Sequence, residues 1–231
     1  MENKGYRWFH IVTAFFVTSL IVSNIIAVKL ISIGGLVLPA AVILFPVAYI
    51  IGDILTEVYG FDRARQVIWT GFFCNLLAVI AIWIAGRLTP PPFWAIGIFD
   101  TSQKAQQAYQ AILGFAPRLL LASFLAYLVG EFLNSIVLAK LKVRTAGRYL
   151  WLRTITSTIV GQGADSAVFI TIAFWGVFPS YALGQAILSQ WLFKVAFETL
   201  ATPFTYLVVN TLKRAEGLDY YDRGTEFKII G

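Results

Sequence analysis

The chain has 231 residues, of which 58% are hydrophobic and only 13% carry a charge. Water-soluble domains carry about 25% charged residues, so this composition excludes an ordinary soluble protein. The net charge of +6 could indicate nucleic-acid binding, but in a membrane protein the positions of Lys and Arg decide their meaning. We therefore expect an integral membrane protein whose main partner is the lipid bilayer, with no nucleic acid bound.

Six stretches contain the roughly 20 apolar residues that a helix needs to cross a bilayer. In chain order they are 8–30, 36–58, 67–88, 117–139, 154–177 and 181–209. The first is too long for the apolar core of a cleaved signal peptide, so we interpret it as a retained helix. The sequence predicts an all-α integral membrane protein, one transmembrane domain with a six-helix bundle, and a flexible cytoplasmic tail at 211–231.

The connection at 89–116 is the only long one between these predicted spans. Its first part, TPPPFWAIGIFD, contains three prolines that exclude a helix. Its second part, TSQKAQQAYQ, is typical of a short helix at the membrane surface. Most Lys and Arg residues fall in the two termini and in the alternate loops on the same side of the membrane as the termini, including the basic run at 140–153. The positive-inside rule therefore predicts cytoplasmic termini.

Ionisable side chains inside predicted spans are costly and usually mark a pathway or a binding site. Asp53 and Glu57 lie four residues apart, and therefore on one helix face. Glu57 is close to the cytoplasmic boundary, where it could simply be solvated, and we leave it out of the candidate site. The first span contributes Asn24, and the later spans carry polar residues at intervals of three or four. These residues are Glu131, Asn134, Ser135, Gln162, Asp165, Ser166, Gln190, Lys194 and Glu198.

Such residues can also simply hold helices together. Lys194 and Glu198, at positions i and i+4, could pair with each other. Five polar stripes together favour a shared cavity that holds a polar molecule. Gly161 and Gly163 permit either close helix packing or space for a ligand, and their polar neighbours favour the second interpretation.

Several chemistries are excluded by missing motifs. Without a G-x-x-x-x-G-K-[ST] loop, the chain cannot bind and hydrolyse ATP in the usual way, so any ATP-driven step requires a partner. We expect no cofactor and no metal, because the only histidine is His10 and the only cysteine is Cys74. GQGAD resembles the G-x-G-D signature of intramembrane aspartyl proteases, but Ala164 shifts the acid about 100° around the helix. We therefore predict that the chain is not an enzyme.

Five long blocks resemble the family of queuosine precursor (7-deazaguanine) transporters, formerly grouped as vitamin uptake proteins. The blocks are SNIIAVK (23–29), FPVAYIIGDILTEVYG (45–60), EFLNSIVLAKLK (131–142), RTITSTIVGQGADSAVF (153–169) and KVAFETLATPFTYLVVNTLK (194–213). The resemblance implies a six-helix bundle like the substrate-binding subunits of energy-coupling-factor importers. It also implies uptake of 7-cyano- or 7-aminomethyl-7-deazaguanine across a bacterial inner membrane. The alternative is a vitamin-binding subunit that needs an ATP-driven partner.

The polar stripes suit such a base, because carboxylates accept hydrogen bonds from its N–H groups while amides can donate to its carbonyl oxygen. Aromatic rings offer a face on which the base can stack. The candidate substrate-binding residues are Asn24, Phe45, Tyr49, Asp53, Glu131, Asn134, Gln162, Asp165, Lys194 and Glu198. We expect a secondary transporter or facilitator with alternating access to this site. The sequence leaves open the preferred base, the coupling ion and whether the protein forms a homodimer.

Overall fold

The computed structural model describes residues 6–33, 36–114 and 117–229. The helices are α1 (Phe9–Ile26), α2 (Phe45–Tyr59), α3 (Phe61–Arg87), α4 (Ser102–Leu113), α5 (Pro117–Arg144), α6 (Leu150–Phe174) and α7 (Ser180–Glu216). Between α1 and α2, the antiparallel strands β1 (Leu30–Ile33) and β2 (Leu36–Pro39) are followed by the short 3-10 helix η1 (Ala40–Ile43). The protein is therefore mainly helical, with one small β-hairpin.

Five helical segments of the described chain are long and apolar enough to cross a membrane, and they contain α1, α3, α5, α6 and α7. Helix α2 has only 15 residues, and at 1.5 Å per residue it is about 22 Å long. A bilayer's hydrocarbon core is about 30 Å thick, so α2 alone is too short to cross it. The structure thus supports a multi-pass membrane protein and differs from the prediction of six full helical spans.

The predicted second span, 36–58, is wrong at its beginning. Residues 36–39 form strand β2, and the α-helix starts only at Phe45, so Pro46 lies in the first turn of α2 instead of inside a helix. The first span likewise ends at Ile26, before strand β1. A short apolar run does not distinguish a strand from a helix by its periodicity, which explains the error.

Helix α2 is the central helix of the bundle. It packs against α1, α3, α5 and α7, and its residues from Gly52 to Tyr59 are all buried. A core cluster joins it to its neighbours through Phe16 of α1, Ile54 and Val58 of α2, and Val67 of α3. Any polar side chain on α2 is consequently enclosed by other helices, and this enclosure positions the candidate site.

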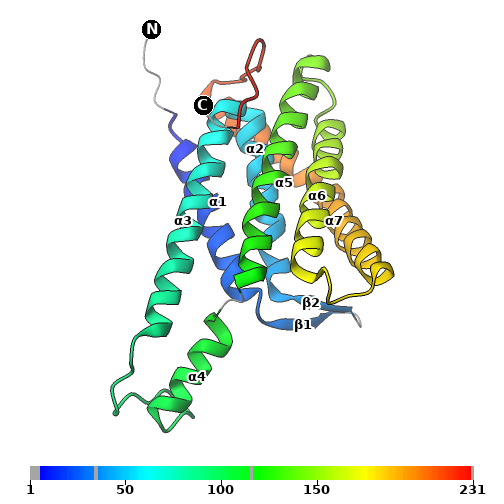
Figure 1. Ribbon diagram of the computed structural model, residues 1–231. Helices are drawn as coiled ribbons and strands as arrows, with labels where there is room; N and C mark the ends of the chain where they lie inside the picture. The colour runs from blue at the N-terminus through cyan, green and yellow to red at the C-terminus, as the bar shows by residue number, and fades with distance from the viewer. Residues whose placement is uncertain (1–5, 34–35, 115–116, 230–231) are drawn as a thin grey trace.

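The start of α1 and the end of the chain lie at one end of the bundle, which we call the terminal end (Figure 1). The hairpin and α4 lie at the opposite end (Figure 1). Helix α4 confirms the short helix expected in the long connection. Its Tyr109 Oη donates to the carbonyl oxygen of Ile82 at 3.0 Å, which fixes α4 to the last turns of α3.

The tail differs from the flexible segment expected at 211–231. Helix α7 continues to Glu216, and residues 217–229, the tail segment, fold back onto the terminal end. Asp222 accepts a hydrogen bond from the backbone N–H of Phe61 at 3.1 Å, and Trp69 Nε1 donates to the carbonyl of Ile229 at 2.9 Å. The tail segment is therefore packed against the beginning of α3.

Candidate functional site

The centre of the bundle contains a buried contact between α2 and α5. Asn134 Nδ2 donates to Asp53 Oδ1 at 2.6 Å, and the two residues are 3% and 1% exposed. The other oxygens of this pair, Asp53 Oδ2 and Asn134 Oδ1, are buried and have no hydrogen-bond partner among the described residues. The pair thus offers two free acceptors to a molecule bound beside it.

Three further oxygens of predicted site residues share this condition in the described part of the chain. Glu131 Oε2, Gln162 Oε1 and Glu198 Oε1 are buried without a protein partner. More than 90% of buried polar groups in proteins are hydrogen-bonded, so five unsatisfied acceptors on α2, α5, α6 and α7 require an explanation. A ligand rich in N–H donors, or water, would satisfy them. We call these five residues the acceptor cluster: Asp53, Glu131, Asn134, Gln162 and Glu198.

Lys194 of α7 contacts α6 and α2 rather than its own helix. Its ammonium group forms an ion pair with Asp165 and lies 5.2 Å from the ring centroid of Tyr49. The alternative that Lys194 pairs with Glu198 is therefore wrong. The rings of Phe45 and Tyr49 are nearly parallel, with centroids 6.3 Å apart and planes at 10°. The stacking face expected from the sequence thus lies next to the one Lys side chain of the site.

Two polar residues of α1 differ in their environment. The predicted site residue Asn24 is half-buried and makes no side-chain hydrogen bond within the described residues. Its neighbour Ser23 is fully buried, and its hydroxyl has no partner there either. Sequence analysis missed Ser23, although Ser19 and Ser23 lie four residues apart on a buried face of an apolar helix. Ser23 is therefore the better candidate on α1.

Glu57 is not solvated, although its position near the predicted boundary allowed it. Its side chain is completely buried, and three basic residues from three helices approach the same carboxylate oxygen. Arg153 Nη2 and Lys213 Nζ lie 2.7 and 2.6 Å from Glu57 Oε1, and Lys142 Nζ lies 3.5 Å away. We call Glu57, Lys142, Arg153 and Lys213 the basic cluster. Glu57 thus belongs to the closed terminal end rather than to the acceptor cluster.

The glycines of α6 pack against other helices, and the pocket expected beside Gly161 is not there. A Cβ atom added to Gly161 would lie 2.7 Å from Asn134 Cβ and 2.8 Å from the carbonyl oxygen of Gly130. A Cβ on Gly163 would lie 3.3 Å from Trp191 Nε1. Gly161 therefore allows α5 and α6 to approach closely, which brings Asn134 into the centre.

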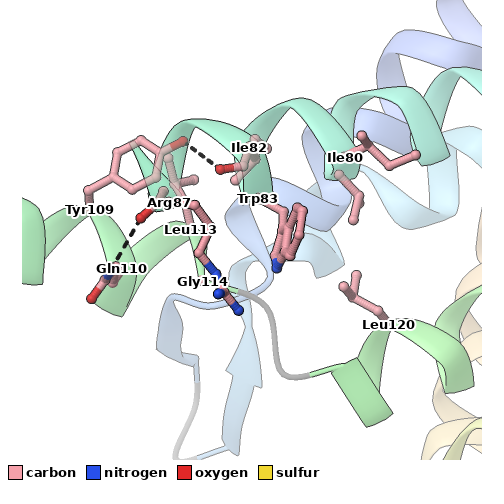
Figure 2. A pocket seen from close by; sticks show the side chains of 11 residues that line it. Ile80, Ile82, Trp83, Arg87, Tyr109, Gln110, Leu113, Gly114 and Leu120 are labelled. Atoms are coloured by element: carbon pink, nitrogen blue, oxygen red, sulfur yellow. Dashed lines mark hydrogen bonds between the residues drawn. The ribbon is translucent and has the colours of Figure 1, made fainter. Parts of the chain in front are cut away.

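Two pockets of the described structure lie away from the acceptor cluster. The first, of about 600 Å³, is formed between α3, α4 and α5, where Trp83 and Leu120 face each other and Arg87 lies at the side (Figure 2). The second, of about 420 Å³, lies on α4. Neither pocket is lined by a residue of the acceptor cluster. In the centre, Asn134 contacts Asp53 and Lys194 contacts Asp165, and we call this arrangement the closed site.

Several membrane-length helices around a buried, incompletely satisfied polar cluster define a multi-pass membrane protein with a polar interior. Residues 39–208 match the family model described as "Putative vitamin uptake transporter". The chain belongs to this family, whose curated members carry the name queuosine precursor transporter. The resemblance found in the sequence is thereby confirmed.

Three curated relatives are similar to this chain, two of them over most of its length and the third over somewhat more than half. The "Probable queuosine precursor transporter" of Bacillus subtilis (strain 168) is 29% identical over 195 residues, which cover 84% of this chain and 81% of that protein. The "Queuosine precursor transporter" of Escherichia coli (strain K12) is 26% identical, with 74% and 70% covered. The "Probable queuosine precursor transporter" of Haemophilus influenzae (strain ATCC 51907 / DSM 11121 / KW20 / Rd) is 27% identical, with 57% and 49% covered. All three names are those of transporters, which agrees with a chain that is not an enzyme.

No solved structure shows a significant similarity to this chain.

Proposed function

We propose that this protein imports a 7-deazaguanine precursor of queuosine, 7-cyano-7-deazaguanine or its 7-aminomethyl form, across a bacterial inner membrane. The family and the names of the relatives support the transport of a queuosine precursor. The observation that carries the assignment of the site is the acceptor cluster, with five buried oxygens that lack a partner among the described residues.

The chemistry of the base complements the acceptor cluster. A 7-deazaguanine has N–H donors on the ring and on the exocyclic amine, which carboxylate oxygens of Asp53 and Glu131 can accept. Its one carbonyl oxygen needs a donor, which the ammonium group of Lys194 or the amide of Gln162 can provide. The flat ring can stack on the face of Phe45 or Tyr49. The excess of acids suits the cationic aminomethyl group or a coupling proton.

The contacts inside the closed site connect binding to a change of conformation. A base placed between α2, α5 and α6 would compete for Asp53 with Asn134 and for Lys194 with Asp165. A ligand that replaces these contacts shifts the balance between two arrangements of the helices, which is what alternating access requires. In this proposal the terminal end, with both termini, faces the cytoplasm.

The proposal is tested by uptake of a labelled 7-deazaguanine in cells that cannot synthesise it. Because each change removes a charged acceptor, Asp53→Asn, Glu131→Gln and Asp165→Asn are expected to lower the initial uptake rate about tenfold or more. Asp100→Asn is the matched control, since its carboxylate pairs with Lys104 on the exposed surface. Uptake at the wild-type rate by all three variants, at equal amounts in the membrane, would contradict the site assignment.

Purified protein in liposomes separates a self-sufficient transporter from a binding subunit. Liposomes that contain this chain alone are expected to take up the labelled base, since the proposed mechanism needs no ATP-driven partner. Binding of the base without any uptake would contradict the transporter and would favour a subunit that depends on a partner.

A further inference from the structure

The terminal end contains more positive charge than its helices can balance. Within the helices, Glu57 is the one carboxylate of the basic cluster, and it faces Lys142, Arg153 and Lys213. The second carboxylate comes from the tail segment. Asp219 Oδ1 lies 2.6 Å from Lys142 Nζ and 2.8 Å from Lys213 Nζ. The tail segment therefore completes the charge balance of this end.

Removal of Asp219 would leave three cations around a single buried carboxylate. Buried charges are stable only when they are paired, and an unpaired one strongly destabilises the arrangement that buries it. Lys142 is 1% exposed and Lys213 is 18% exposed, so water can compensate only in part for the missing acid while the helices stay together. Separation of α5 and α7 from Glu57 would admit water and relieve the repulsion.

The tail segment also fits the surface of the terminal end closely. Gly60 and Gly147 have φ values of +83° and +76°, and aromatic rings of the tail lie directly above them. A Cβ atom on Gly60 would lie 2.2 Å from Tyr220 Cδ1, and one on Gly147 would lie 2.1 Å from Tyr221 Oη. These two glycines lie in the α2–α3 and α5–α6 connections. The tail segment is thus seated across the junctions of four helices.

We infer that the tail segment is a latch that holds the terminal end closed, because Asp219 balances the charge of the basic cluster. This inference rests on the proposed transport function, in which the path from the acceptor cluster to this side must open once in each cycle. Release of Asp219 from Lys142 and Lys213 would unbalance the basic cluster and open that path. Return of the tail segment would close it again.

A buried cysteine between the two clusters reports the opening without any substrate. Ser135 is 1% exposed, follows Asn134 directly and lies two turns before Lys142 on α5. Ser135→Cys in a Cys74→Ser background is expected to react slowly with a maleimide in the purified detergent-solubilised protein. Asp219→Asn is expected to raise this rate about tenfold, a moderate factor because the Asp219 side chain is 43% exposed.

A second variant tests whether charge balance is the cause. Lys142→Gln together with Asp219→Asn removes one cation and one anion, so the labelling rate is expected to return close to that of the parent. Glu226→Gln is the matched control in the same tail segment, because within the described residues the ion pair of Glu226 is with the exposed Lys228, and the variant should leave the rate unchanged.

Two results would overturn the latch. One is an unchanged labelling rate in Asp219→Asn, and the other is a raised rate that the double variant does not lower. Because labelling is measured without substrate, either result would leave the uptake experiment, and with it the proposed function, untouched.

Discussion

Asp53 and Glu57 lie one turn apart on α2, but their surroundings differ. Glu57 is surrounded by three basic residues, which compensate its charge. Asp53 contacts the neutral amide of Asn134, and its second oxygen has no partner among the described residues. The negative charge of Glu57 therefore stabilises the fold, whereas that of Asp53 is a cost in the absence of a ligand. Binding sites commonly retain polar groups at the expense of stability.

This contrast predicts opposite effects on stability. Glu57→Gln leaves three cations without their shared carboxylate, so the free energy of unfolding should fall by about 3–5 kcal/mol. Asp53→Asn removes an unpaired buried charge and should leave stability unchanged or raise it. Thermal unfolding of the purified variants measures both. Asp62→Asn is the control for an exposed pair with Arg65, and its effect should stay below about 1 kcal/mol.

Asp219 gives the latch a defined dependence on pH. Burial alone would raise the pKa of Asp219, but the hydrogen bonds and charges of Lys142 and Lys213 prevail and lower it below the usual 3.8. A lowered acid pKa means that the ionised group stabilises the folded state above pH 3.8 and that this contribution is lost as the pH falls through the lower native value. Among the described residues, Glu57 also faces these two lysines, and Asp222 of the tail segment lies close enough to Lys142 for their charges to interact.

The tail segment is therefore expected to stay attached from about pH 8 to about pH 5 and to be released only under strongly acidic conditions. A spin label at the exposed position Arg223→Cys would measure this release as a gain in mobility. Release near pH 6 would contradict a role for Asp219, because that carboxyl group remains ionised there.

At the scale of single elements, α5 and α6 depend on their glycines. An added methyl group on Gly161 meets the backbone of Gly130 and the Cβ of Asn134, and neither can move without displacing a helix. Gly161→Ala should therefore destabilise the protein by about 1–3 kcal/mol, as overpacking does, and should weaken uptake by shifting Asn134 away from Asp53. Thermal unfolding and the uptake assay measure the two effects.

Gly184→Ala is the matched control for this substitution. Gly184 also lies in a membrane-length helix, α7, but apart from its chain neighbours and the backbone of its own helix, no described atom lies within 4 Å of the position that its Cβ would occupy. The variant should be neutral or slightly more stable, because alanine is the better helix former. Equal destabilisation by the two substitutions would show that close packing of α5 on α6 is not the cause.

The hairpin shows why a hydrophobic pattern alone did not distinguish a strand from a membrane-spanning helix. Its residues 30–33 and 36–39 are apolar except for Ser32, and because neither run contains a charged residue, they continue the hydrophobic pattern of a span. The pair Gly34–Gly35 between two short apolar runs was the available signal, since paired glycines are typical of tight hairpin turns. Helix α4 could be predicted because prolines precede it and polar residues recur along it.

At the scale of the whole molecule, the burial of polar residues was easier to predict from the sequence than the identity of their contact partners. Intervals of three and four residues place Lys194 and Glu198 on one stripe, but the rotation of each helix in the bundle decides the actual partners. Lys194 therefore pairs with Asp165 on α6. For the same reason, the position of Glu57 near the end of its predicted span did not reveal that Arg153 and Lys213 would enclose it.

The proposed orientation predicts which surfaces an impermeant reagent can reach in intact cells. In a Cys74→Ser background, a cysteine at the exposed Gln107 of α4 should be labelled from outside, since α4 lies at the end opposite to the termini. A cysteine at Arg223 in the tail segment should be labelled only after the membrane is permeabilised. The reverse pattern would contradict cytoplasmic termini.

The order of the basic cluster along the chain has a consequence for biosynthesis. Glu57 is made 85 residues before Lys142, 96 before Arg153 and 156 before Lys213. At about 5–20 residues per second, a newly inserted α2 waits several seconds for its first counter-ion and longer for the rest. Until a counter-ion arrives, burial of the Glu57 carboxylate is costly, so we expect α2 to settle among its neighbours only after the helices that carry these basic residues have been made.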